Sequence, residues 1–298
     1  MGDCTRPLRW QIFRHRRTHK HLKRNISNSR RLLAMLNFTK LVQNEGIKIF
    51  TKIGTWVMIA FIPILVIAIA FLCKYANQEE LAVNNAWEFL DLCLSAIPNL
   101  MDIVTLFTII VAAGIVASEF SGGTIKLLLI RPFSRSTILL SKFVTVLLFG
   151  LGLTLLLLLT TFLMGGIFFG FDGASQLHAG AAFSNVAYSL KAIGYSGIEM
   201  IVMVTLAFMF SSVFRASSMA IGISLFFLLT SGQLAYVLKQ FEWSKFLIFA
   251  NTNLLSYVDG RPLMASMSLS FSLIMLACYQ LLFLALAWYV FAKRDVSI

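Results

Sequence analysis

Residues 118–142 read SEFSGGTIKLLLIRPFSRSTILLSK, and this stretch separates two long apolar runs. Its two adjacent glycines, Gly122 and Gly123, allow the backbone to leave a preceding helix, because glycine tolerates the conformations that end helices. Arg131 precedes Pro132, which disfavours helical geometry at Arg131 and therefore ends any helix there. A basic loop of this kind between membrane helices is expected on the cytoplasmic surface.

Between these two breaks, residues 124–130 can form about two helical turns. Ser134 is a favourable N-cap for a second helix that begins near Arg135. The short helix is apolar on nearly all sides, which is unusual at a water boundary unless both of its sides are covered. Its own membrane domain can cover one side. For the other side, the residues leave a partner protein and the membrane surface open as alternatives.

The composition as a whole indicates an integral membrane protein. The 298 residues are 58% hydrophobic and only 13% charged, and the mean hydropathy is +0.82. These values lie far outside the range of soluble globular proteins.

The basic residues gather near the N-terminus. Ten of the 25 Lys and Arg residues precede Met35. Residues 1–35 are therefore expected to form a basic tail beside anionic membrane lipids rather than a nucleic-acid-binding segment. Arg30 and Arg31 can be encoded by a ribosome-binding sequence, which makes Met35 the expected natural start of the protein.

Residues 36–53 predict an amphipathic helix that lies on the membrane before the first span. The apolar residues that share one face at helical spacing are Phe38, Leu41, Val42, Ile49 and Ile53. Glu45 interrupts this face. It can either pair with a neighbouring base or face a partner subunit, and both alternatives stay open.

The remaining apolar runs predict an all-α protein with six membrane-spanning helices. Each run is long enough to cross a hydrocarbon core of about 30 Å. The expected spans are residues 54–73, 97–117, 143–166, 192–213, 218–238 and 269–292. With the N-terminus inside, 20 Lys and Arg residues fall on the inner side and 5 on the outer side. This bias predicts that both termini are cytoplasmic.

Two acidic residues lie inside predicted spans. Asp102 is expected near the outer end of the second span and Glu199 about two turns inside the fourth. A charged side chain within a bilayer costs roughly 2.5–3.5 kcal/mol on insertion scales, so both should face protein or water. Asp102 can simply extend its carboxylate to the outer surface. Both residues are also candidates for a translocation path or a subunit interface, and for Glu199 structural pairing is an equal alternative.

Two outer segments carry clusters of aromatic and apolar side chains. Residues 85–97 are expected to form a helix at the membrane interface, and residues 241–268 precede the last span. Aromatic residues at this depth usually anchor a protein at the interface, and contact with cargo is the alternative.

No motif for catalysis, phosphate binding or metal binding occurs in the sequence. The chain has no G-x-x-x-x-G-K-[ST], no H-E-x-x-H and no G-x-S-x-G. Its four cysteines lack metal-ligand spacing, although Cys73 and Cys93 could both lie near the outer face and form a disulfide. We therefore expect no catalytic residue, no bound cofactor and no metal in this chain.

The stretch that begins with Glu119 resembles the signature of type-2 ABC transporter permeases. The resemblance extends from about Leu36 to Ile298 and includes the final Phe-Ala-Lys-Arg-Asp-Val. It implies that the loop holds a cytoplasmic coupling helix, between the second and third spans, which a separate ATP-binding subunit grips. The residues to which it assigns this role are Glu119, Gly122, Gly123, Thr124, Lys126, Leu127, Leu128, Arg131, Pro132, Ser134, Arg135 and Lys142.

By this resemblance the chain would be the permease subunit of an exporter in a bacterial cell membrane. It would pair with a second permease, identical or related, and with two copies of an ATP-binding subunit, which would hold the ATP and Mg²⁺. Related permeases handle peptide antibiotics, sodium or lipid-linked carbohydrate, and a hydrophobic or amphipathic cargo is expected here. The alternatives are an ATP-independent secondary transporter and a membrane immunity or sensor protein.

Overall fold

The structure is a computed structural model that describes residues 38–75, 83, 85–95, 99–123, 134–171, 182–214, 216–258, 262–264 and 266–293. Over these residues the chain is helical and contains no strand. A first helix covers residues 38–50 and is called helix 38–50 below. The elements that follow are α2 (Ile53–Tyr75), α3 (Ala86–Ser95), α4 (Leu100–Ser121), α6 (Arg135–Phe169), α7 (Ala182–Val213), α8 (Ser217–Leu238), η2 (Glu242–Phe246), α9 (Ile248–Thr252), α10 (Leu255–Val258) and α11 (Leu269–Lys293).

Six of these helices are long and apolar enough to cross a membrane, which confirms the predicted number of spans and identifies a multi-pass membrane protein. They are α2, α4, α6, the part of α7 from Tyr188 to Val213, α8 and α11. Two helices begin well before the predicted spans: α6 begins at Arg135 rather than at residue 143, and α7 begins at Ala182 rather than at residue 192. The Ser134 side chain accepts a hydrogen bond from the Thr137 backbone N–H at 3.1 Å, so the predicted N-cap starts one continuous helix.

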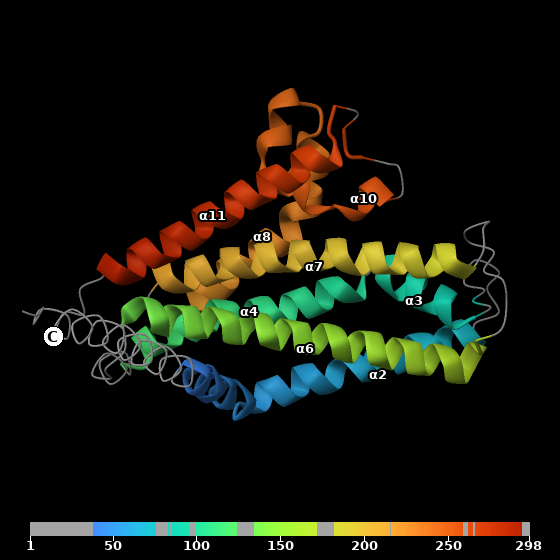
Figure 1. The fold of residues 1–298 in the computed structure, drawn as a ribbon, viewed down its shortest axis with the longest axis horizontal. Coiled ribbons are helices and arrows are strands. Elements are labelled where there is room, and N and C mark those ends of the chain that lie inside the picture. Colours follow the sequence, from blue (N-terminus) through green and yellow to red (C-terminus); the bar gives the residue numbers. More distant parts are fainter. Residues whose placement is uncertain are drawn as a thin grey trace, which may run out of the picture.

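The helix α4 lies at the centre of the bundle. In Figure 1, α2, α4, α6 and α7 extend along the long axis of the molecule, and α8 and α11 are inclined to them. One side of α4 is lined by small residues with no exposed surface, among them Ala112, Ala113 and Ala117. Small side chains let neighbouring backbones approach closely, which favours packing of helices within a bilayer. The most extensive helix pair in the structure is accordingly α4 with α7.

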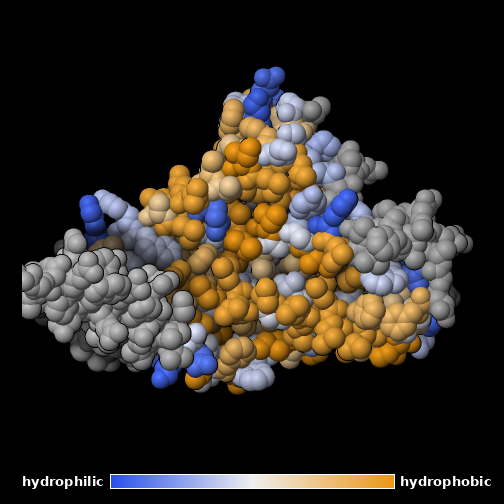
Figure 2. All heavy atoms as spheres, viewed as in Figure 1, coloured by the Kyte–Doolittle hydropathy of each residue, from blue (hydrophilic) through white to orange (hydrophobic). Residues whose placement is uncertain are grey.

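The outer helices expose apolar side chains. Figure 2 shows hydrophobic residues over most of the middle of one face, with hydrophilic residues mainly at the ends and at the tip of the α8–α11 projection. Most residues of α2, α8 and α11 are at least partly exposed in the single chain. Surface of this kind suits contact with lipid or with a second membrane subunit.

The helix α6 has 35 residues, which corresponds to a length of about 52 Å at 1.5 Å per residue. Two of its glycines lie at points where α6 approaches other helices closely. A Cβ atom added at Gly150 would lie 2.9 Å from Cγ2 of Thr108 in α4. One added at Gly165 would lie 3.0 Å from Cα of Ala86 in α3. Neither position has room for a larger residue, so α6 is held tightly near its middle and near its C-terminal end.

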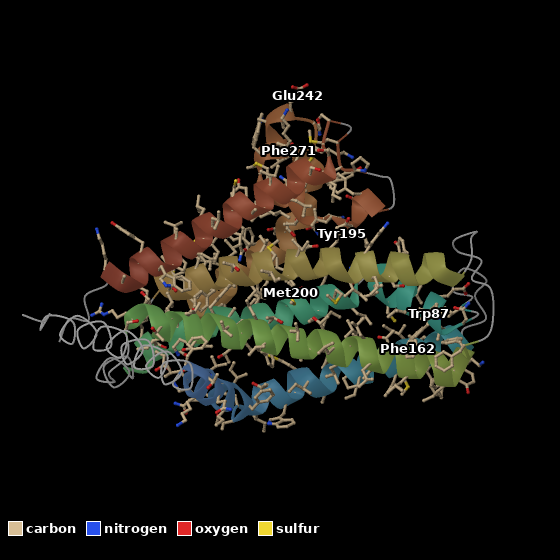
Figure 3. All side chains as sticks on the ribbon, in the orientation of Figure 1. Trp87, Phe162, Tyr195, Met200, Glu242 and Phe271 are labelled. Carbon is tan, nitrogen blue, oxygen red and sulfur yellow. The ribbon has the colours of Figure 1, made fainter. Side chains whose placement is uncertain are left out.

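The helix α3 is packed inside the protein more than expected of an interfacial segment. Phe89 and Leu94 are almost fully buried, because α6 and α7 both cover this short helix. Trp87 is partly exposed, and its ring centroid lies 5.6 Å from that of Phe162 in α6. Figure 3 shows these two labelled side chains together near one end of the bundle. Cys73 and Cys93 are free thiols, so the disulfide considered from the sequence is not formed.

Candidate functional site

The junction between helix 38–50 and α2 is fixed by two side-chain hydrogen bonds. The last carbonyl groups of a helix lack partners within the helix itself. The Thr55 hydroxyl donates to the carbonyl oxygen of Ile49 at 2.7 Å, and the Trp56 indole N–H donates to that of Phe50 at 2.9 Å. These bonds set the direction of helix 38–50 relative to the first span.

Four charged side chains form a closed ring where helix 38–50, α4 and α6 meet. The Lys142 ammonium lies 2.5 Å from Oε2 of Glu45 and 3.2 Å from Oε1 of Glu119. The Lys48 ammonium lies 2.9 Å from Oε1 of Glu45 and 2.8 Å from the same Glu119 oxygen. Each base therefore contacts both acids, and the four formal charges sum to zero. We call Glu45, Lys48, Glu119 and Lys142 the charge ring.

The charge ring is buried on one side and open on the other. The side chain of Lys142 is 1% exposed and those of Glu45 and Glu119 are 8% and 11% exposed, whereas that of Lys48 is 45% exposed. The Lys142 ammonium also donates to the Ile115 carbonyl oxygen at 3.3 Å. Burying a charge is costly unless it is paired and hydrogen-bonded, and the ring meets both conditions.

The two acids of the ring raise the pKa of Lys48, which lies on its open side. Burial acts to lower the pKa of Lys48, but the hydrogen bonds and charges of Glu119 and Glu45 outweigh it and place this pKa above its ordinary value. Lys48 therefore stays protonated at neutral pH.

The charge ring lies at the base of the segment that joins α4 to α6. Gly122 caps α4, and Gly123 adopts a φ of 68°, in the left-handed region that favours glycine. Glu119 stands one turn before this break, and Lys142 lies in the second turn of α6 beyond the loop. Of the residues predicted to contact an ATP-binding subunit, those outside the described residues are Thr124, Lys126, Leu127, Leu128, Arg131 and Pro132.

Two more of the predicted contact residues organise the start of α6. Ser134 is its N-cap, and Arg135 donates a hydrogen bond from Nη1 to the carbonyl oxygen of Ala292 at 3.2 Å. This bond lies at the C-terminal end of α11, where helix carbonyls favour a cation. The beginning of α6 is thus bound to both helix 38–50 and α11.

The two acidic residues of the predicted spans belong to α4 and α7, which pack against each other. Asp102 is exposed in the first turn of α4, where the helix dipole favours a negative charge. Glu199 is half-buried in α7. Among the described residues Glu199 has no ion pair. Their roles in a translocation path or a subunit interface stay predictions.

Sequence reasoning missed several polar contacts. The Ser189 hydroxyl donates to Oδ1 of the buried Asp91 at 2.5 Å, which joins α7 to α3. The Gln280 amide donates to the Thr205 hydroxyl at 2.8 Å, which joins α11 to α7. For Glu45 a signal did exist, since an acid on the apolar face of an amphipathic helix requires a partner. Within the described part of the chain no three His, Cys, Asp or Glu side chains gather as metal ligands do.

Comparison with known proteins places the chain among bacterial relatives. The family described as "Protein of unknown function (DUF2705)" matches residues 41–297. The uncharacterized protein YhcI of Bacillus subtilis (strain 168) is 38% identical, over 88% of this chain and 100% of YhcI. The uncharacterized membrane protein YdbK of the same organism is 34% identical, over 69% of this chain and 82% of YdbK.

Proposed function

The chain belongs to the family described as "Protein of unknown function (DUF2705)", and for it we propose the role of membrane-spanning permease subunit in an ATP-binding-cassette exporter. Two ATP-binding subunits would hold the ATP and Mg²⁺, and a second permease, identical or related, would complete the membrane path. The chain itself would be a transport subunit rather than an enzyme.

The observation that supports this proposal best is the charge ring at the base of the loop over residues 124–133. Glu119 and Lys142 flank that loop. Lys142 forms ion pairs with Glu119 and with Glu45 of helix 38–50. A force applied to the loop would therefore reach helix 38–50 directly, because the paired charges resist separation in a buried site. A coupling element needs such a connection, since it must convert closure of an ATP-binding subunit into movement of membrane helices.

We further propose that the end of the molecule with the charge ring faces the cytoplasm, in a bacterial cell membrane with both termini inside. The C-terminal ends of α4 and α11 and the N-terminal end of α6 lie at the same end of the bundle as helix 38–50 (Figure 1). Among the described residues this end carries Lys40, Lys48, Arg135 and Lys293, and the positive-inside rule associates such basic residues with the cytoplasmic side. Helix 38–50 would then lie on the inner membrane surface.

The cargo that fits this proposal is hydrophobic or amphipathic. The membrane-facing helices α2, α8 and α11 present apolar side chains, and such a cargo can enter laterally from the bilayer. Glu199 and Asp102 would face the path or the second subunit, because a charged side chain costs less free energy in contact with protein or water than in contact with lipid.

The test is co-expression with a candidate ABC ATPase, taken from a neighbouring gene that encodes one, followed by purification through a tag on this chain. We expect the ATPase to co-purify with the natural sequence and with Leu128→Met, which keeps an apolar side chain. Leu128→Asp places a charge on the predicted coupling helix and should reduce association about tenfold or more, since a desolvated unpaired charge costs roughly 2–5 kcal/mol.

Two results would count against the proposal. Equal ATPase association and transport in Leu128→Asp and Leu128→Met would remove the loop as the coupling element. Transport by the purified chain alone, with no ATPase present, would instead indicate a secondary transporter.

A further inference from the structure

An apolar groove lies between helix 38–50, α2 and α6, away from the charge ring's loop. Gly46 lies in one wall and Gly152 in the opposite wall. A Cβ atom added at either glycine would meet nothing within 4 Å. A Cβ atom would therefore fit at both positions, and nearly every other residue favours a helix more than glycine does. The space between the two walls exists because both positions lack a side chain.

The dimensions of the groove match one acyl chain in one leaflet. Its volume is about 490 Å³, within the range of sites for small amphipathic molecules. Along α6 it extends from Thr145 to Leu156, which is about 16 Å at 1.5 Å per residue and about half of a 30 Å hydrocarbon core. Phe50 and Phe149 form part of its wall, with ring centroids 6.2 Å apart.

Polarity changes along the groove. The polar side chains that line it, Gln43 and Thr145, lie near the N-terminal end of α6, where the Thr145 hydroxyl contacts the Val42 carbonyl oxygen at 3.4 Å. The opposite end, at Leu156, is entirely apolar. A molecule with one polar end and one long apolar chain fits this order in only one direction.

A positive charge stands beside the polar end, and an interfacial aromatic residue lies at the C-terminal end of helix 38–50. Lys40 is exposed and lies one helical turn before Gln43, so the two side chains are neighbours on helix 38–50. The exposed indole of Trp56 is hydrogen-bonded to the carbonyl oxygen of Phe50, which lines the groove. Tryptophan at such a position marks the headgroup level of a membrane. A negative headgroup would complement Lys40.

From this geometry we infer that the groove is a binding site for one anionic phospholipid, with an acyl chain between Gly46 and Gly152 and the headgroup beside Lys40. The lipid belongs to the leaflet on the side of the N-terminal end of α6, which is the inner leaflet if the orientation proposed above holds. The bound chain fills the space between helix 38–50 and the membrane domain, so the lipid itself becomes part of the packing of this helix. The inference does not depend on an ATP-binding partner.

The experiment is native mass spectrometry of the purified chain, titrated with mixed micelles of phosphatidylglycerol and phosphatidylcholine in equal amounts. We expect about one phosphatidylglycerol to be retained per chain at low micelle concentration. Gly46→Leu and Gly152→Leu, made singly and together, fill the groove and should each lower occupancy about tenfold or more. The matched control is Gly222→Leu in α8, where an added Cβ also meets nothing within 4 Å, and it should retain the lipid.

The headgroup placement is tested separately. Lys40→Gln should keep lipid binding but lose the preference for phosphatidylglycerol over phosphatidylcholine. Unchanged occupancy in both groove-filled variants, or equal loss in Gly222→Leu, would overturn the inference. A shift of the groove-filled variants from dimer to monomer without lipid loss would show that a second copy of the chain occupies the groove. A melting temperature measured for each variant identifies any that fails to fold.

Discussion

Replacement of Lys142 by methionine tests whether the charge ring holds helix 38–50 against the bundle. The Lys142 side chain is 1% exposed. The change keeps much of its apolar stem but removes the ammonium, which contacts both Glu45 and Glu119. The two acids would then share only Lys48, and the ring would carry a net negative charge in a buried site. Removing one partner of a buried ion pair typically destabilises a protein by about 3–5 kcal/mol, and we expect Lys142→Met to fall in that range.

The matched control is Lys48→Met, which removes the same charge from the open side of the ring. The side chain of Lys48 is 45% exposed, so water can solvate the two acids where its ammonium is removed. We expect the free energy of unfolding to fall by about 0–1 kcal/mol. The double variant Lys142→Met with Glu45→Gln restores neutrality to the ring and should recover part of the loss, with a coupling energy of about 0.5–3 kcal/mol.

The assay is unfolding of each variant in mixed detergent micelles, followed by helical circular dichroism. Limited proteolysis near residues 51–52 supplies a local readout of whether helix 38–50 has detached. If Lys142→Met is no more destabilised than Lys48→Met, the ring does not carry the buried charge energy assigned to it, and its role as a mechanical connection fails as well.

Two further predictions concern orientation and nucleotide. In a cysteine-free background, Glu242→Cys at the tip of the α8–α11 projection (Figure 3) should react with an impermeant thiol reagent added to intact cells, and Ser136→Cys near the start of α6 should not, because the loop end is expected inside; the reverse pattern would invert the topology. The purified chain without an ATPase should neither bind nor hydrolyse ATP, because its sequence has no phosphate-binding Gly-Lys loop; specific nucleotide binding measured by calorimetry would contradict this.

The membrane spans could be predicted from the sequence because each depends on local information. About twenty consecutive apolar residues are sufficient to indicate a span, whatever the helix packs against. The start of α6 could also be predicted from local information, since Ser134 follows Pro132 closely and has the side chain that an N-cap requires. The predicted span began at residue 143, just after Lys142, and the structure shows that this lysine is paired within the bundle.

The charge ring could not be predicted because its members are far apart in the sequence. Lys142 and Glu45 are separated by 97 positions, and nothing in either local sequence specifies the partner. Glu45 on an apolar face indicated an unmet charge, but matching it to Lys142 requires the packing of three helices. The burial of α3 escaped prediction for the same reason, since the close approach of Ala86 to Gly165 depends on distant segments.

The length and attachment of α6 give it the properties of a lever. Its close contact with Thr108 at Gly150 lies near the middle of its 35 residues and can act as a fulcrum. Because an α-helix rises 1.5 Å per residue, a tilt of about 5° around this point would displace Arg135 by about 2 Å and Phe169 by about 2.5 Å in the opposite direction. A small sideways displacement of the N-terminal end of α6 would thus move its C-terminal end in the opposite direction, where α6 contacts α3.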